Sequence, residues 1–188
     1  MKRIVITGSD GFVGSGFEPA GTVMRFDLKN GADILTTRVG EMIREFDPHI
    51  VYHLAAHHYV PWTEEHPHET HQTNAVGTAL MLQACGPSLQ TFVLASSAAV
   101  YGFDPKPIPE TTKPTGDSVY GWSKRQAEAE LRDFAVKHLD VRCVAARLFN
   151  IVGPGDTWPH ILPVIVKNLH QSFGIGNVWP LRDYVHVD

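Results

Sequence analysis

The sequence predicts an α/β fold built on a doubly wound parallel sheet with helices on both faces. Five short apolar runs have the length and composition of strands, at residues 4–6, 23–26, 50–54, 91–95 and 141–148. Helical segments lie between them, at residues 37–46, 69–85 and 119–138. Alternation of strands and helices with short connections is typical of a parallel sheet. Ligands of such sheets bind at the carboxyl ends of the strands, where the candidate functional residues of this chain also fall.

The first apolar run leads directly into a glycine-rich segment. Residues 4–6 are apolar without alternation, as in a strand that is buried on both faces. Gly8, Gly11 and Gly14 follow at a spacing of three. Glycines here allow a tight turn and the close approach of a pyrophosphate to the backbone at a helix N-terminus. The pattern predicts a Rossmann-type dinucleotide site, and the alternative is a glycine-rich loop without a ligand.

The second run, residues 23–26, ends at Asp27. A carboxylate at this position can accept hydrogen bonds from both hydroxyls of an adenosine ribose. It would also repel the 2′-phosphate that distinguishes NADP from NAD. Arg25 and Lys29 flank Asp27 and could attract that phosphate. We therefore predict NAD as the cofactor, with a limited preference over NADP.

The segment between these two runs is short for the helix that should connect them. Gly16, Pro19 and Gly21 restrict any helix there to about one turn. Either this protein has a shortened first helix or residues are missing from the sequence. The sequence leaves both interpretations open.

A tyrosine and a lysine four residues apart mark the last helical segment. Tyr120 and Lys124 fall on one helical face, where the ammonium charge can stabilise a phenolate and lower the pKa of the tyrosine toward neutrality. Ser97, at the end of the fourth run, can supply a third hydrogen-bonding group for proton transfer. The structural alternatives are a Lys124–Glu128 ion pair, a serine that satisfies a strand end, and a half-buried aromatic ring.

Composition restricts the class of protein. The 188 residues suffice for one well-buried domain, with 43% hydrophobic and 19% charged residues. The formal net charge of −4 does not indicate nucleic-acid binding, and no apolar stretch reaches membrane-spanning length. Two cysteines are too few for a disulfide framework, which favours a reducing, cytoplasmic environment. The eleven histidines lack the spacing of metal ligands, so we expect no metal site.

Together these segments resemble the NAD-dependent nucleotide-sugar epimerase/dehydratase family of the extended short-chain dehydrogenase/reductase superfamily. The pattern is most similar to that of UDP-sugar 4-epimerases, and it extends in order over nearly the whole chain. It is carried by the segments TGSDGFVG (7–14), VYHLAA (51–56), TNAVGT (73–78), SSAAVYG (96–102), YGWSK (120–124), RLFN (147–150) and RDYVHVD (182–188).

The resemblance implies a set of site residues. The catalytic residues would be Ser97, Tyr120 and Lys124. NAD would be bound by Gly8, Gly11, Phe12, Val13, Gly14, Asp27, Asp33, Ile34, Leu54, Ala55, Ala56, His58, Asn74, Tyr120, Lys124 and Leu148. The nucleotide sugar would be bound by Ser97, Tyr120, Asn150, His160, Ile161 and Arg182. An NAD-binding domain would span residues 1–152, and a nucleotide-sugar-binding region would begin over residues 153–188.

The residues after Ser97 distinguish the activities of this family. Nucleotide-sugar 4,6-dehydratases carry an Asp-Glu pair there, whereas this chain has Ala98 and Ala99, which transfer no proton. The resemblance therefore implies epimerisation at C4 through a 4-keto intermediate. Tyr120 would take the proton of the C4 hydroxyl while a hydride passes to NAD. A 4-ketoreductase and a non-catalytic NAD-binding fragment are the alternatives.

Family members continue well beyond the motif that contains Arg182 and build a C-terminal lobe over the sugar. This chain ends at Asp188, so we expect it to bind NAD and to turn over nucleotide sugars poorly or not at all. The resemblance also suggests a homodimer. We expect neither a nucleic-acid nor a membrane partner.

Overall fold

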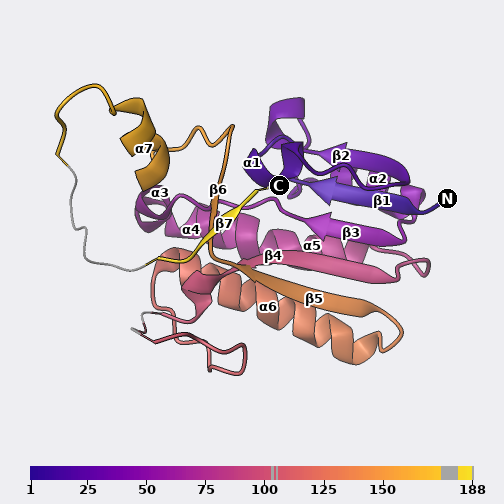
Figure 1. The fold of residues 1–188 in the computed structure, drawn as a ribbon. Helices are drawn as coiled ribbons and strands as arrows, with labels where there is room; N and C mark the ends of the chain where they lie inside the picture. The colour runs from indigo at the N-terminus through magenta and orange to yellow at the C-terminus, as the bar shows by residue number, and fades with distance from the viewer. Residues whose placement is uncertain (103, 105, 175–181, 188) are drawn as a thin grey trace.

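The fold is organised around a five-stranded, all-parallel sheet with the strand order β2-β1-β3-β4-β5 (Figure 1). The computed structural model describes residues 1–102, 104, 106–174 and 182–187. The strands are β1 (Arg3–Thr7), β2 (Thr22–Phe26), β3 (Ile50–His53), β4 (Thr91–Ser97) and β5 (Arg142–Leu148). Each predicted strand is present, and the predicted doubly wound α/β fold is confirmed.

Three helices form a layer on one face of this sheet. They are α2 (Thr37–Phe46), α5 (Gly77–Ala84) and α6 (Val119–Lys137), and α5 packs against both of the others. Right-handed crossovers that all advance in the same direction place their helices on the same face. Phe92 and Leu94 of β4 point into this layer and are fully buried, whereas Val93 between them faces away and is half-buried. The main core therefore lies between the sheet and the three helices.

The opposite face carries a much smaller helix, α1 (Phe12–Ser15). Just after α1, the ring of Phe17 packs edge-on against Tyr52 of β3, with centroids 4.5 Å apart. The guanidinium of Arg25 donates to the carbonyl oxygens of Gly14 at 3.4 Å and Phe17 at 2.7 Å. These are carbonyls that a longer helix would have paired internally. A first helix of about one turn is thus confirmed, and the side chain of Arg25 caps its C-terminal end.

The predicted helix over residues 69–85 is divided into three parts. It consists of α4 (Pro67–His71), a π-helical turn, η2 (Gln72–Val76), and α5. A further helix that the sequence analysis missed, α3 (Val60–Glu65), precedes them. The proline at position 67 separates α3 from α4, because proline is tolerated in the first turn of a helix and not in its interior. Short 3₁₀ turns follow β2 and β4, as η1 (Leu28–Asn30) and η3 (Ala98–Val100).

A second, two-stranded sheet forms beyond β5. Strands β6 (Asn150–Val152) and β7 (Tyr184–His186) pair in parallel, and α7 (Ile161–Lys167) lies between them in the chain. This pairing joins the two parts of the chain that we divide at residue 152. The division into a cofactor domain and a substrate region stays a prediction. In the described part of the chain, no helix has the length and apolar character needed to cross a membrane.

Candidate functional site

The glycine loop that follows β1 lies in close contact with the backbone that follows β3. Gly8 has a φ of +70°, and a Cβ at this position would lie 2.6 Å from the backbone nitrogen of Ala55, beyond the end of β3. A Cβ on Gly14 would lie 2.2 Å from the carbonyl oxygen of Gly8. Both positions therefore exclude any side chain. The loop lies at the carboxyl ends of β1 and β3, where the strand order reverses and dinucleotides bind in this type of sheet.

The carboxylate of Asp27 lies beside the glycine loop. It accepts hydrogen bonds from the backbone nitrogens of Asp10 at 3.0 Å and Lys29 at 2.9 Å. The ammonium of Lys29 in turn donates to the carbonyl oxygen of Asp10 at 2.7 Å. Arg25 is held by the carbonyls that end α1. Both cations that flank Asp27 in the sequence are thus engaged with backbone carbonyls, which weakens the case for a 2′-phosphate site.

Tyr120 and Ser97 meet through a close approach between η3 and the start of α6. A Cβ on Gly121 would lie 2.5 Å from the carbonyl oxygen of Ala99, so only glycine allows this approach. The hydroxyl of Ser118 caps α6 by accepting from the nitrogen of Gly121 at 2.9 Å. Ser97 accepts from the nitrogen of Ala99 at 3.1 Å, and its hydroxyl lies close enough to that of Tyr120 to favour the phenolate.

The predicted low pKa of Tyr120 is wrong for the chain by itself. Burial raises the pKa of Tyr120, because a phenolate loses hydration, and the hydrogen bond from Ser97 offsets this only in part. The ammonium of Lys124 lies 6.0 Å from the centre of the Tyr120 ring. Lys124 is itself buried, and burial lowers its pKa to about 8.

The suggested Lys124–Glu128 ion pair does not form, because both side chains have other partners. The ammonium of Lys124 donates to the carbonyl oxygen of Ala95 at 2.8 Å. The carboxylate of Glu128 accepts from Nε and Nη2 of Arg147 at 2.8 and 2.7 Å, and from the hydroxyl of Ser96 at 2.6 Å. Arg147 lies in a segment that resembles a substrate motif of the family. Its guanidinium nevertheless donates to the carboxylate of Glu128.

Asn74 holds the segment that follows β3. Its side-chain oxygen accepts from the backbone nitrogen of His57 at 2.8 Å, and its nitrogen donates to the carbonyl of His57 at 2.9 Å. The same nitrogen donates to the hydroxyl of Ser123 at 2.9 Å. Both amide hydrogens of Asn74 are therefore used within the protein. The neighbouring residues Leu54, Ala55 and Ala56 are half-buried beside the glycine loop.

The remaining predicted cofactor residues lie at the carboxyl edge of the sheet or just beneath it. Ile34 is buried in the core, and the carboxylate of Asp33 accepts from the backbone nitrogen of Leu35 at 2.9 Å. Leu148 pairs with Ser97 in register, at the last positions of β5 and β4. Phe12 and Val13 form the first turn of α1 and are half-buried.

Two of the predicted residues, His58 and His160, meet in an aromatic cluster at the start of α7. Their ring centroids lie 5.9 Å apart, and Nδ1 of His160 lies 2.8 Å from a carboxylate oxygen of Asp156. The ring of Trp158 stacks on Tyr59 with centroids 5.3 Å apart and meets His58 edge-on at 5.0 Å. No sequence pattern pointed to Tyr59, Asp156 or Trp158, although each lies within four residues of a predicted residue.

The other predicted substrate residues lie around β6 and β7. The side-chain nitrogen of Asn150 donates to the carbonyl oxygen of Asp183 at 2.8 Å, which brings it next to the exposed Arg182. Ile161 begins α7 and is exposed. Asn150 and Arg182 thus form one group, and His160 and Ile161 form another with His58.

Residues 4–188 match the profile of the NAD dependent epimerase/dehydratase family. The chain belongs to this family. It is 33% identical over 160 residues to the UDP-glucose 4-epimerase of Erwinia amylovora, with coverage of 73% of this chain and 48% of the relative. It therefore spans about half the length of that relative.

Solved structures of this family share the fold. One is the UDP-glucose 4-epimerase of Thermus thermophilus in complex with NAD, with a TM-score of 0.83, 27% identity and coverage of 98% of this chain and 70% of that one. Another is RMD from Pseudomonas aeruginosa in complex with NADPH, with a TM-score of 0.85, 27% identity and coverage of 100% and 70%. Proteins in complex with either nicotinamide cofactor are thus similar to this chain.

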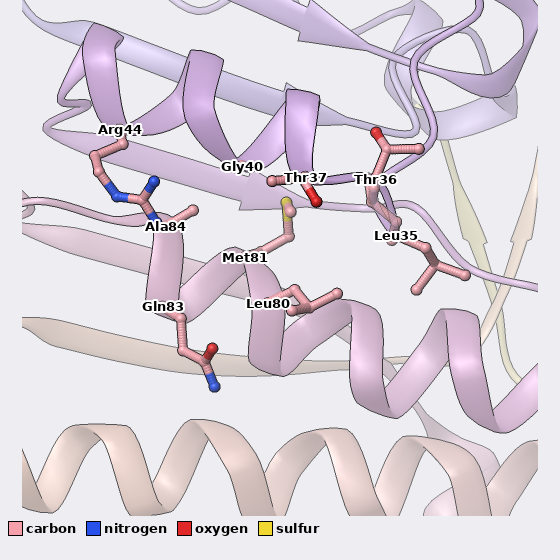
Figure 2. Close-up of a pocket in the computed structure, with 10 residues that line it drawn as sticks. Leu35, Thr36, Thr37, Gly40, Arg44, Leu80, Met81, Gln83 and Ala84 are labelled. Atoms are coloured by element: carbon pink, nitrogen blue, oxygen red, sulfur yellow. The ribbon is translucent and has the colours of Figure 1, made fainter.

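The predicted site is distinct from the pocket between α2 and α5 (Figure 2). That pocket has a volume of about 170 Å³ and is lined by residues 34–37, Gly40, Arg44, Leu80, Met81, Gln83 and Ala84. It lies within the helical layer and shares only Ile34 with the predicted site. Among the described residues, no group of three or more His, Cys, Asp or Glu side chains could hold a metal ion. Several histidines instead pack on tryptophan, such as His66 on Trp62.

Proposed function

We propose that this chain binds NAD across residues 8–14 and forms part of a nucleotide-sugar 4-epimerase. The observation that carries the proposal is the proximity of the hydroxyls of Ser97 and Tyr120, with the buried Lys124 one turn further along α6. The glycine loop fits a dinucleotide, because Gly8 and Gly14 allow an approach that any Cβ would block. The carboxylate of Asp27 lies at the edge of the same loop, where it suits the adenosine ribose.

Each residue of the trio has a role that its surroundings support. NAD, when bound, would supply the reversible hydride acceptance that the reaction needs. Tyr120 would take the proton of the C4 hydroxyl and later return it. Ser97 would donate a hydrogen bond to the same oxygen, and the buried positive charge of Lys124 would favour the phenolate. The side chains of Ala98 and Ala99 hold no acid or base, which disfavours elimination of water.

The alternatives differ in cofactor and in product. A nucleotide-sugar 4-ketoreductase would use the same trio, and a similarity to an NADPH-bound relative favours it. The engagement of Arg25 and Lys29 with backbone carbonyls, next to the negative charge of Asp27, favours NAD and therefore the epimerase. A non-catalytic NAD-binding protein would bind the cofactor without turnover. A UDP-sugar as substrate, a homodimer and a cytoplasmic location stay predictions.

The test is incubation of the protein and added NAD with UDP-glucose or UDP-galactose, followed by NMR of the sugar products. We expect at most a slow interconversion of the two sugars, and loss of that activity in Tyr120→Phe. Tyr52→Phe serves as the control, because the ring of Tyr52 packs on Phe17 and Tyr52 is not among the predicted site residues. A 4-keto-6-deoxy sugar would identify a dehydratase. NAD binding without any conversion would favour the non-catalytic alternative.

A further inference from the structure

A line of buried polar side chains runs beneath the proposed NAD site. Its five members are Thr7, His53, Asn74, Thr78 and Ser123, and each is at most 1% exposed. They come from β1, β3, η2, α5 and α6, so the line crosses from the sheet to the catalytic helix. Polar groups are costly to bury unless their hydrogen bonds are satisfied, so the directions of these bonds constrain the arrangement.

The direction of each bond around His53 follows from donor and acceptor chemistry. The hydroxyl of Thr78 donates to the carbonyl oxygen of Asn74 at 2.7 Å, so it has no second hydrogen for His53. Nε2 of His53, 3.1 Å away, must therefore donate to Thr78. Nδ1 of the neutral ring then accepts from the hydroxyl of Thr7 at 2.7 Å. The oxygen of Thr7 accepts in turn from the backbone nitrogen of Ala55 at 3.3 Å.

The line continues from Asn74 to the catalytic helix. The amide of Asn74 donates to the hydroxyl of Ser123 at 2.9 Å, and Ser123 donates to the carbonyl oxygen of Tyr120 at 2.8 Å. Each hydrogen donated along this line of side chains has a single acceptor. Burial lowers the pKa of His53 to about 3, which agrees with a neutral ring at physiological pH.

We propose that His53 is a positioning residue that, as the neutral Nε2–H tautomer, sets the glycine loop in register with the helix that carries Tyr120. His53 lies beneath the loop, so it acts through Thr7 and Thr78. Thr7 directly precedes Gly8, and Thr78 closely follows the π-helical turn that presents Asn74. π-helical turns of this kind often accompany functional sites. This inference rests on the proposed binding of NAD at the glycine loop.

The alternative is a core histidine that contributes only to stability. The two interpretations differ in what happens to NAD affinity when the protein is fully folded. A structural role lowers the melting temperature and leaves the affinity of the folded protein unchanged. A positioning role lowers the affinity as well, because the loop and the catalytic helix lose their common connection.

The experiment compares Thr78→Val with Thr70→Val. Both threonines are fully buried, and both donate to a backbone carbonyl four residues earlier, Thr70 to His66 at 2.8 Å. Only Thr78 also contacts His53. We expect Thr78→Val to weaken NAD binding about tenfold at a temperature well below unfolding, Thr78→Ser to restore it, and Thr70→Val to leave it unchanged. His53→Gln provides a second variant should Thr78→Val fail to fold, and we expect the same loss of affinity from it.

A second measurement tests the directions of these hydrogen bonds. ¹⁵N NMR of the histidine rings should identify His53 as the neutral Nε2–H tautomer in the wild-type protein. An Nδ1–H tautomer would overturn the proposed bond directions. Equal NAD affinity of folded Thr78→Val and Thr70→Val would overturn the positioning role. Failure of the wild-type chain to bind NAD would instead overturn the proposed function, and the positioning role with it.

Discussion

The ammonium nitrogen of Lys124 lies 2.8 Å from the backbone carbonyl oxygen of Ala95, so a buried cation is held against the end of β4. Lys124 is 3% exposed, and burial lowers its pKa from 10.5 to about 8. The folded protein therefore tolerates the charge at a cost. The charge is available to influence the phenol of Tyr120 one helical turn earlier.

The first prediction concerns the pH dependence of stability. Between pH 8 and 10.5 the unfolded chain keeps the Lys124 proton that the folded protein has released. At this group the unfolded state then binds more protons, so the contribution of Lys124 to the free energy of unfolding rises with pH, by about 3 kcal/mol over this window. Cys85 acts in the opposite direction, because burial raises its pKa to about 12. Urea unfolding at several pH values therefore compares wild type with Lys124→Met, which should lose the Lys124 contribution, and with a substitution of the exposed Lys137, which should keep it. Equal pH slopes in wild type and Lys124→Met would contradict the assignment.

The second prediction concerns the ionisation of Tyr120. In the protein without added cofactor, burial should keep the pKa of Tyr120 above its usual 10, and Ser97→Ala should raise it further by removing a hydrogen bond to the phenolate. The difference in ultraviolet absorbance between wild type and Tyr120→Phe, titrated with base, isolates this tyrosine. Added NAD should lower the pKa, because the nicotinamide cation favours the phenolate. A phenolate at neutral pH without NAD would disagree with the structure.

The third prediction concerns the choice between NAD and NADP. Asp27→Ala should weaken NAD binding about tenfold or more, because hydrogen bonds to a charged group are lost, and should affect NADP less. Calorimetric titration of both cofactors measures the ratio. Lys29→Ala is the matched control, since the Lys29 ammonium is engaged with the carbonyl of Asp10. An unchanged ratio in Asp27→Ala would remove Asp27 from the ribose site.

The fourth prediction tests the contact that brings Ser97 to Tyr120. Gly121→Ala would place a methyl group 2.5 Å from the Ala99 carbonyl oxygen, which forces η3 and α6 apart. We expect a loss of stability of about 1 to 3 kcal/mol, as for other overpacked positions. Gly16→Ala is the control, because nothing lies within 4 Å of its added Cβ. Urea unfolding compares the two variants, and similar stabilities would mean that the close approach relaxes freely.

The fifth prediction concerns Glu128 and Arg147. Burial by itself would raise the pKa of Glu128, but the hydrogen bonds from Arg147 and Ser96 outweigh it and lower the pKa. Glu128→Leu should destabilise the protein by about 2 to 3 kcal/mol, because it leaves the partly buried guanidinium unpaired. The double variant Glu128→Leu with Arg147→Met should recover much of that loss. Additive losses in the double-mutant cycle would show that the pair does not act as a unit.

Much of the fold was predictable because its signals are local in the chain. Apolar runs mark the strands of a parallel sheet wherever helices cover them. The predicted bounds of α2 and α6 agree with the structure to within one residue at each end. The glycine spacing and the Tyr120–Lys124 spacing also depend only on neighbouring residues. The family resemblance then extended these local signals to a complete set of site residues.

The sequence by itself therefore determined the strands, the helices α2 and α6 and the identity of the proposed catalytic trio. Tertiary structure decided how the buried charges and hydroxyls are partnered: Lys124 with Ala95, Glu128 with Arg147, and His53 with Thr7 and Thr78. The His53 partners lie 46 and 25 positions away in the chain. No periodic pattern in the sequence predicts pairs at such separations. They form because each buried polar group must find a partner in the folded protein, and only the packing of the elements determines which one is within reach.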